Sequence, residues 1–384
     1  MESRVATRTG GLFFPVLILL PLVCFSGPDV RLSIELDSVA AAARMHAARA
    51  SHTSTLLPSG KVLIAGGFAG SGTENNPYPS AELYDPRTRS FQRAGNMTTG
   101  RSGHTATLLK NGKLLIVGGW SGRDGVRRAA EIYDPTAGKF MPTGNMVNER
   151  AGNTATLLPD GRVLVTGGQD RSENALASAE VYDPATGTFS VTGSMGNPRG
   201  AHTATALKNG KVLVVGGGSG HYPSQTICRT AEVYDPATGR FTATGQMSAA
   251  RHKHAAVLLP SGKVLVVGGS DNRDWNGEYS SAEVYDPSTG AFSSTGAMNT
   301  ARFKLPEAVV LLDNGKVLIA GGGSFAEIYD ETKGSFRKVE GNLGTARLFA
   351  CATVLPDGET LITGGYASTG AGLPATASAW IYRP

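Results

Sequence analysis

The chain has 384 residues, a length that suits two or three ordinary domains or a single array of repeats. Its 51 glycines and its 17% of charged residues are typical of a turn-rich, well-buried β protein and exclude a disordered chain. The formal net charge of +5 is spread along the chain, with no basic run longer than Arg127-Arg128, so we expect no nucleic-acid partner.

Residues 1–27 have the pattern of an export signal. Arg4 and Arg8 precede an apolar block from Leu12 to Phe25, and the small residues Ser26-Gly27 follow it. The block is too short to span a bilayer comfortably. We therefore expect a cleaved signal peptide, no stable transmembrane anchor, and a periplasmic or secreted protein.

Six copies of one short motif run through the rest of the chain, and each follows a Gly-Gly pair. The motif reads Ala-Glu-Leu-Tyr-Asp-Pro from Ala81, and its relatives begin at Ala130, Ala179, Ala231, Ala282 and Ala326. A degenerate seventh copy consists of Gly364-Gly365 and Ala379–Pro384. A period of roughly fifty residues indicates a propeller array. We expect one domain over residues 28–384, with blades that start near residues 45, 97, 146, 195, 247, 298 and 343.

The second copy shows how one repeat makes four strands. Asn111-Gly112 lies between two apolar runs, which is a strong hairpin signal because both turn residues tolerate positive φ. A third strand follows the variable loop after Gly-Gly, and the turn Asp134–Gly138 leads into a fourth strand near Phe140. Four antiparallel strands in fifty residues make one propeller blade. The predicted fold is an all-β, seven-bladed β-propeller of four-stranded antiparallel blades.

The ring has a predicted seam, because the seventh copy stops after its third strand. Upstream of the first blade, Val30, Leu32, Ile34 and Leu36 alternate with polar residues inside the segment 28–44. We expect this segment to supply the fourth strand of blade seven, closing the ring and covering its exposed edge.

A downstream aromatic follows the tyrosine of each of the six copies. These residues are Phe91, Phe140, Phe189, Phe241, Phe292 and Phe336. Together with the Gly-Gly pairs, this pattern resembles the kelch repeat, in which tryptophan usually stands where this chain has phenylalanine. The resemblance covers Met45 to Pro384.

Kelch propellers include the galactose-oxidase core, periplasmic sialic-acid mutarotases and many protein-binding modules, so the fold alone names no function. We expect an exported, non-enzymatic monomer that binds a protein or glycan through its variable-loop face, with no cofactor. The alternatives are a carbohydrate-active enzyme such as a periplasmic sugar (sialic acid) mutarotase and, with less support, a galactose-oxidase-like copper oxidase. Copper chemistry of that kind needs two tyrosines and two histidines, with one tyrosine cross-linked to a cysteine.

Charged residues recur at two repeat positions that fall at the same end of every blade. The arginines are Arg49, Arg101, Arg150, Arg199, Arg251, Arg302 and Arg347. The glutamates are Glu82, Glu131, Glu180, Glu232, Glu283 and Glu327. Seven free guanidiniums could form a cationic channel mouth, but unpaired buried charge is rare, so we expect structural Arg–Glu pairs. Trp380 replaces the seventh glutamate, which leaves one arginine near the seam without its partner.

Histidines occupy one repeat position in four blades, three residues after the arginine. They are His52, His104, His202 and His254. A metal site needs three or four ligands converging on one point, whereas residues related by rotation around a propeller lie far apart. We therefore expect buried or channel-lining structural histidines and no metal site.

The loops between Gly-Gly and Ala-Glu vary most, and loops on a rigid scaffold are the usual place for recognition. Three of these loops carry residue types that are enriched at binding hot spots. The candidates are Trp120, Arg123 and Arg127 in blade two, His221 and Tyr222 in blade four, and Asp271, Arg273, Trp275 and Tyr279 in blade five.

Blade six departs from the other repeats in two ways. Its variable loop shrinks to Gly323–Phe325, and its first crossover has two extra residues between Arg302 and Gly315. A short wall beside long ones predicts a notch in the rim, and we expect Lys304 and Glu307 to point into it.

Overall fold

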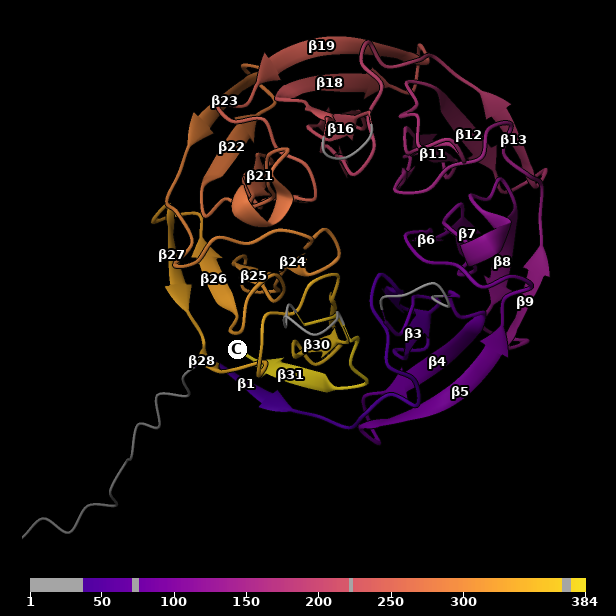
Figure 1. Ribbon diagram of the computed structural model, residues 1–384, viewed down its shortest axis with the longest axis vertical. Helices are drawn as coiled ribbons and strands as arrows, with labels where there is room; N and C mark the ends of the chain where they lie inside the picture. Colours follow the sequence, from indigo (N-terminus) through magenta and orange to yellow (C-terminus); the bar gives the residue numbers. More distant parts are fainter. Residues whose placement is uncertain (1–36, 71–75, 221–223, 368–373) are drawn as a thin grey trace, which may run out of the picture. The chain divides into compact units, whose positions relative to one another are not determined.

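The computed structural model describes residues 37–70, 76–220, 224–367 and 374–384. Seven sheets stand around a central axis, each with its first strand innermost, so the predicted all-β propeller is confirmed (Figure 1). The expected signal peptide, the alternating residues from Val30 to Leu36, and His221 and Tyr222 lie outside the described residues. Within the described ranges, no helix is long and apolar enough to cross a membrane.

The blades follow one another in chain order. Blade one contains β2 (Thr53–Leu56), β3 (Val62–Ala65), β4 (Ser80–Asp85) and β5 (Ser90–Asn96). Blade two contains β6 (Thr105–Leu108), β7 (Leu114–Val117), β8 (Ala130–Asp134) and β9 (Lys139–Pro142). Blade three contains β10 (Thr154–Leu157), β11 (Val163–Thr166), β12 (Ala179–Asp183) and β13 (Thr188–Val191). Blade four contains β14 (Thr203–Ala206), β15 (Val212–Val215), β18 (Thr230–Asp235) and β19 (Arg240–Gln246).

The remaining blades complete the ring. Blade five contains β20 (Ala255–Leu258), β21 (Val264–Val267), β22 (Ala282–Asp286) and β23 (Ala291–Ser294). Blade six contains β24 (Val309–Leu311), β25 (Val317–Ile319), β26 (Glu327–Asp330) and β27 (Ser335–Lys338). Blade seven contains β29 (Cys351–Val354), β30 (Thr360–Thr363), β31 (Ala379–Arg383) and β1 (Ser38–Ala41), with β28 (Glu340–Gly341) beside β1. The variable loops hold the short hairpin of β16 (Gly218–Ser219) with β17 (Thr226–Ile227), and two 3-10 turns, η1 (Gly122–Asp124) and η2 (Asp274–Asn276).

The core lies between neighbouring blades rather than inside each one. Every residue of the second strands, such as Leu114–Val117 in β7, is buried because both faces of the sheet are covered. One cluster joins Leu63 and Met97 of blade one to Ile116 and Tyr133 of blade two. Each blade therefore completes the core of its neighbour, as repeat architectures require.

The Gly-Gly pairs allow adjacent blades to approach each other closely. Gly66 has a φ of 69°, in the left-handed region that favours glycine. A Cβ atom there would lie 2.6 Å from the carbonyl oxygen of Arg101 and 2.6 Å from Cε1 of His104, both in the next blade. The glycine thus leaves room for the arginine–histidine crossover of its neighbour.

The ring closes through β1, as the repeat arithmetic predicts. Val39 pairs with Tyr382 and Ala41 with Trp380 in an antiparallel ladder between β1 and β31. On its other side, β1 pairs in parallel with β28, which follows the last strand of blade six. The closing strand lies at Ser38–Ala41, within the predicted segment 28–44 but downstream of its alternating apolar residues.

A second closure surrounds the inner channel. One residue per blade, two positions after the recurring arginine, has a left-handed φ between 52° and 63°. Each of these residues donates its backbone N–H to the carbonyl of its counterpart in the preceding blade, with N···O distances of 2.7–3.2 Å. We call these residues the mouth ring: Ser51, Gly103, Gly152, Ala201, Lys253, Lys304 and Phe349. The seventh bond, from Ser51 to Phe349, makes the circle continuous.

Candidate functional site

The variable loops and the arginine crossovers meet at one end of the propeller. Isolated backbone bridges join Ala50 to Phe68, Ser102 to Trp120 and His252 to Ser270. The mouth ring lies at the same end, because its residues sit between the arginines and the first strands. This loop end of the molecule contains both cavities described below.

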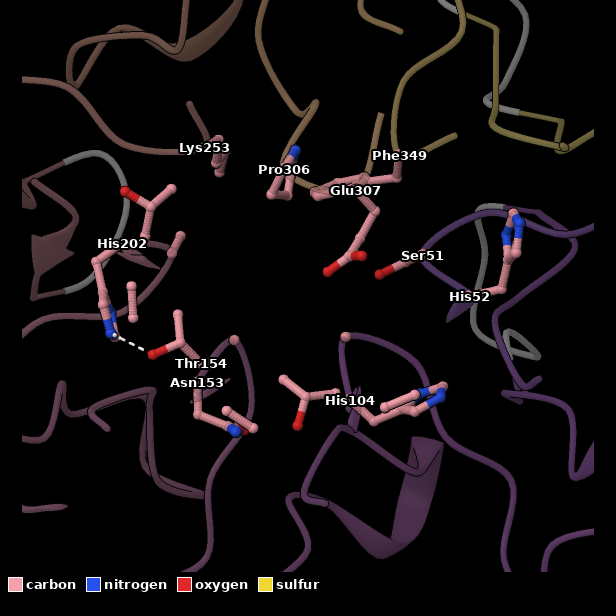
Figure 2. A pocket seen from close by; sticks show the side chains of 18 of the residues that line it. Ser51, His52, His104, Asn153, Thr154, His202, Lys253, Pro306, Glu307 and Phe349 are labelled. Atoms are coloured by element: carbon pink, nitrogen blue, oxygen red, sulfur yellow. Dashed lines mark hydrogen bonds between the residues drawn. The ribbon is translucent and has the colours of Figure 1, made fainter. Parts of the chain in front are cut away.

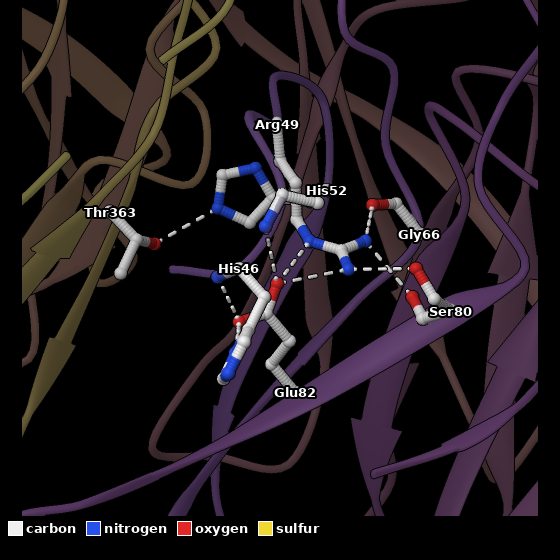
Figure 3. Close-up of polar contacts among 8 residues, drawn as sticks. His46, Arg49, His52, Gly66, Ser80, Glu82 and Thr363 are labelled. Carbon is white, nitrogen blue, oxygen red and sulfur yellow. Dashed lines mark hydrogen bonds and ion pairs between the residues drawn. The ribbon is translucent and has the colours of Figure 1, made fainter. Parts of the chain in front are cut away.

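Six of the recurring arginines form ion pairs with the recurring glutamates of their own blades. The nitrogen–oxygen distances of the six pairs are 2.8–3.2 Å, and all twelve side chains are buried. In blade one, Arg49 also donates to the carbonyls of Gly66 and Ser80, while Glu82 accepts backbone bonds from His46 and Ala47 (Figure 3). Burial alone would raise the pKa of Glu82, but these bonds and the charge of Arg49 lower it overall.

The seventh arginine differs. Arg347 is half-buried, donates to the carbonyl of Leu343 and stacks over Trp380 at 5.3 Å, and it forms no ion pair with any described residue. Six of the arginines therefore fix the crossover of a blade to the third strand of that same blade, rather than form a cationic mouth.

The four histidines form a belt that joins neighbouring blades, which we call the histidine belt. His52 Nε2 lies 2.9 Å from Thr363 Oγ1, and His104, His202 and His254 contact threonines of their preceding blades at 2.9–3.2 Å. Burial, followed by the charge of the neighbouring arginine, lowers the pKa of His52 to about 3, and the other three shift in the same direction. These histidines are therefore neutral structural groups at physiological pH.

Asn153 interrupts the belt between blades two and three. Its side-chain oxygen and nitrogen are buried without hydrogen-bond partners, and so is the hydroxyl of Thr105, the threonine that a histidine would reach. Asparagine is shorter than histidine, which explains why both partners are left unsatisfied. At the interface of blades five and six, Leu305 and Ala255 replace the polar pair and pack in one apolar cluster.

A cavity of about 430 Å³ occupies the mouth of the central channel (Figure 2). Its wall consists mainly of the mouth ring and the belt positions, and Lys253 and Glu307 supply its charged groups. The two extra residues of blade six explain why Glu307 lies in the channel. They form an exposed turn at Pro306 and Glu307 that projects into the lumen. The surrounding wall raises the pKa of the Glu307 carboxyl, which has no hydrogen-bond or ion-pair partner among the described residues.

Lys304 does not point into a notch, which corrects the sequence expectation. It is buried, and its ammonium donates to the hydroxyl of Tyr366 at 2.7 Å. Aromatic rings surround it, with centroid distances of 4.3 Å to Trp275, 4.7 Å to Phe303, 5.4 Å to Tyr366 and 5.9 Å to Phe349. Burial and the charge of Lys253 lower the pKa of Lys304 to about 8. Cation–π contacts of this kind stabilise a charge that burial disfavours.

The predicted notch does exist, beside the short loop of blade six. It is a cavity of about 330 Å³ between the loops of blades five, six and seven, and neither Lys304 nor Glu307 lines it. We call this cavity the notch; its wall includes Trp275, Glu278, Thr300, Gly322, Gly323, Ser324, Phe325 and Leu348.

The blade-five loop reaches the notch through η2. Asp274 has a left-handed φ of 53° and binds the Lys253 ammonium at 2.7 Å and 2.9 Å. Burial opposes the charge of Asp274, but contacts with His252 and Lys253 hold its pKa well below the usual range. This anchored turn places Trp275 over Lys304 and leaves the indole 38% exposed.

The other loop candidates are spread around the rim rather than gathered at one point. Trp120 is 38% exposed and bridges Ser102 and Val126, while Arg127 pairs with Asp124 at 2.6 Å. Arg123 lies in η1 and is exposed. In blade five, Asp271 pairs with Arg273 at 2.6 Å, and the ring of Tyr279 lies 5.1 Å from the guanidinium carbon of Arg251.

Sequence reasoning missed Glu278, Tyr366 and Phe349 as members of this region. Glu278 stands beside two residues that were singled out, Trp275 and Tyr279, but its type alone carried no signal. Tyr366 follows the Gly-Gly pair of blade seven, where its meeting with Lys304 depends on three-dimensional structure.

A solved structure with a similar fold is a fungal alcohol oxidase of the AA5 family, in complex with copper. The superposition has a TM-score of 0.69 and covers 91% of this chain and 76% of that chain, at 18% sequence identity. At this identity the similarity shows the fold alone.

The described residues do not provide the donor set of a copper centre of that kind. The described residues contain no group of three or more His, Cys, Asp or Glu side chains placed to hold a metal ion. The belt histidines direct Nε2 to threonines in four separate blade interfaces, and Cys351 donates its thiol to the carbonyl of His52 rather than meeting a tyrosine ring.

No curated protein matches the chain. The model of the Kelch motif matches four of its repeats, at residues 49–98, 150–196, 199–248 and 251–299. These matches cover blades one, three, four and five, and the structure shows the same four-stranded blade in the repeats between and after them. The chain therefore belongs to the kelch-repeat family.

Proposed function

We propose that this protein is an exported, non-enzymatic propeller that binds a glycan or protein ligand through its loop end. The observation that carries the proposal is the placement of both cavities at this end, together with two partly exposed tryptophans, Trp275 in the wall of the notch and Trp120 elsewhere on the rim. Exposed tryptophan is rare on inert surfaces, and it stacks on sugar rings and anchors protein interfaces.

The opposite end of the propeller offers a contrast. It consists of tight turns such as Asn111-Gly112, and each Asp-Pro turn is fixed locally, as where Asp134 accepts the backbone N–H of Thr136 at 2.9 Å. Because these turns repeat in nearly every blade, they present a uniform surface with little basis for selecting one ligand.

The proposal is tested by binding of the full-length chain to a glycan array and to purified envelope proteins. The double variant Trp120→Ala/Trp275→Ala should lose the binding seen with the wild type. Val191→Ser is the matched control, since Val191 is an exposed apolar residue on the outermost strand β13. Binding that survives in the double variant, or that is lost equally in the control, would contradict the proposal.

Glu307 favours a second candidate, a sugar mutarotase working in the channel mouth. An unpaired carboxyl with a raised pKa, lining a cavity of about 430 Å³, is suited to move protons during anomer exchange. The measurement is the rate of anomer exchange of free sugars, sialic acid included, with the wild type and Glu307→Gln. Acceleration that disappears in this variant would establish the enzyme and refute the binding-only function.

A further inference from the structure

The notch between blades five and six has an aromatic and apolar wall. Trp275 and Phe325 supply two aromatic rings, Leu348 supplies an aliphatic side, and Gly322 and Gly323 leave the remaining wall without side chains. Lys304 lies over the indole of Trp275, and the same indole lines the notch and stays 38% exposed. Part of this ring is therefore available to a ligand.

The same wall carries one carboxylate, Glu278, whose burial is only partly compensated. Glu278 is half-buried and has no hydrogen bond or ion pair with any described residue. Burial raises the pKa of Glu278, and the nearby charge of Lys304 offsets this only in part. The hydroxyl of Thr300, on the same wall, is also buried without a hydrogen-bond partner.

The other charged groups near the notch are already paired. Arg302 binds Glu327 at 2.8 Å and stacks on Phe325 at 5.0 Å. Asp274 binds Lys253, and Lys304 is held by its aromatic cage and Tyr366. Glu278 is therefore the group whose desolvated charge a ligand could neutralise.

We propose that the notch binds an organic ammonium group, through the exposed part of the Trp275 ring and the carboxylate of Glu278. Aromatic faces attract cations that have lost part of their water, and a buried carboxylate gains most from a partner of opposite charge. The cavity volume suits a small head group rather than a large ligand. The inference rests on the proposed function and specifies the chemistry that one part of the loop end recognises.

The same chemistry already operates within the molecule. Lys304 and Lys338 place their ammonium groups 4.3 Å from the ring of Trp275 and 4.4 Å from that of Phe325. Both rings thus already bind cations of the protein itself, and the part of Trp275 that stays exposed is what a ligand can reach. The ammonium could belong to a free small molecule, an amino sugar or the lysine side chain of a bound protein.

The first test compares a cation with its neutral isostere. Choline and 3,3-dimethylbutan-1-ol have nearly the same shape, but only choline is charged, and calorimetric titration of the full-length chain measures both. We expect saturable choline binding and about tenfold weaker binding of the alcohol, the factor that one desolvated cation–π contact contributes. Equal binding of the two probes, or no saturable binding of choline, would overturn the inference.

The second test uses variants. Glu278→Gln keeps the shape of the side chain and should weaken choline binding about tenfold, and Trp275→Ala should do the same. Val191→Ser is the control, because Val191 is an exposed apolar residue on the outermost strand β13 and does not line the notch. A choline affinity that is unchanged in Glu278→Gln, or is lowered as much in Val191→Ser, would place the site elsewhere. Thermal unfolding of each variant shows that it remains folded.

Two further probes distinguish the possible sources of the ammonium group. A comparison of choline binding with macromolecular binding then distinguishes the ammonium site from the proposed function. Glucosamine and Nα-acetyl-lysine methylamide compete with choline according to whether the notch prefers an amino sugar or a lysine side chain. If glycan or protein capture by the loop end survives in Glu278→Gln, the proposed function stands and the ammonium site is not part of it. If choline binds but no macromolecular ligand is captured, the notch stands and the proposed function fails.

Discussion

The blade interfaces fall into two groups that solve the same packing problem differently. At the seven–one, one–two, three–four and four–five interfaces, a histidine contacts a threonine of the preceding blade. Between blades two and three, Asn153 stands in place of the histidine and makes no such contact. At the interface of blades five and six this polar pair is replaced by Leu305 and Ala255, and the notch and the Lys304 cage lie in the same arc. Repeated residues build the frame, and the departures from the repeat create the features that distinguish this protein.

The largest expected difference between the two groups concerns the recurring arginines. Arg199→Ala should destabilise the protein by about 3–5 kcal/mol, because it leaves Glu232 buried without its partner. Arg347→Ala, at the seam of the other arc, should cost only about 1 kcal/mol, since this side chain stacks on Trp380 and pairs with no carboxylate. Urea unfolding of both variants measures the difference, and equal losses would show that the ion pairs do not stabilise the blades.

Acid should unfold the protein mainly through the histidine belt. The folded pKa of His202 is about 3, below the unfolded value of 6.5, so the unfolded chain binds the extra proton between these pH values. Stability is then complete above about pH 6.5 and falls by about 1.4 kcal/mol per pH unit for each such histidine on acidification.

Denaturant unfolding at pH 4 to 7 tests the acid dependence. His202→Gln should reduce the slope of the unfolding free energy against pH by the equivalent of one proton. Lys304→Met, in the other arc, should leave this slope unchanged. If the slope of His202→Gln equals that of the wild type, the belt does not cause the acid sensitivity.

The smallest expected effect is a gain in stability. Asn153→His should restore the missing bond to Thr105 and stabilise the protein by about 1 kcal/mol. The matched change Leu305→His should destabilise it, because Ala255 offers no hydroxyl and a buried polar group would be left unpaired. Thermal unfolding compares the two variants, and effects of the same sign would refute the pairing rule.

The fold was predictable because each signal recurs in every repeat. The hairpin at Asn111-Gly112 and the Gly-Gly pairs have local causes, namely positive φ and close approach of the next blade. The closing strand followed from counting strands, and its described residues, Ser38–Ala41, lie within the predicted segment 28–44. Backbone pairing with β31 selects the closing residues, and it does not require an alternating pattern.

The candidate site was predictable only in outline. Trp275 stood out by its type, and the short loop of blade six correctly indicated a notch. The depth of Lys304 and the projection of Glu307 into the channel were not predictable, because they depend on the path of a two-residue insertion. The left-handed turn at Asp274, four residues before Glu278, is signalled by no residue pattern in the loop.

The mouth ring has a consequence for how this opening can change. Its backbone N–H donors are engaged in one continuous circle, so they are not available to a ligand, and the circle is made without side chains. Selectivity at the opening is then set by the six mouth-ring positions that line the cavity, of which four are small, from Ser51 to Ala201, and two are large, Lys253 and Phe349. Glycine or asparagine fits the left-handed backbone at each of them. The backbone of the mouth ring is thus fixed, and the side chains that it presents to the channel can be substituted one blade at a time.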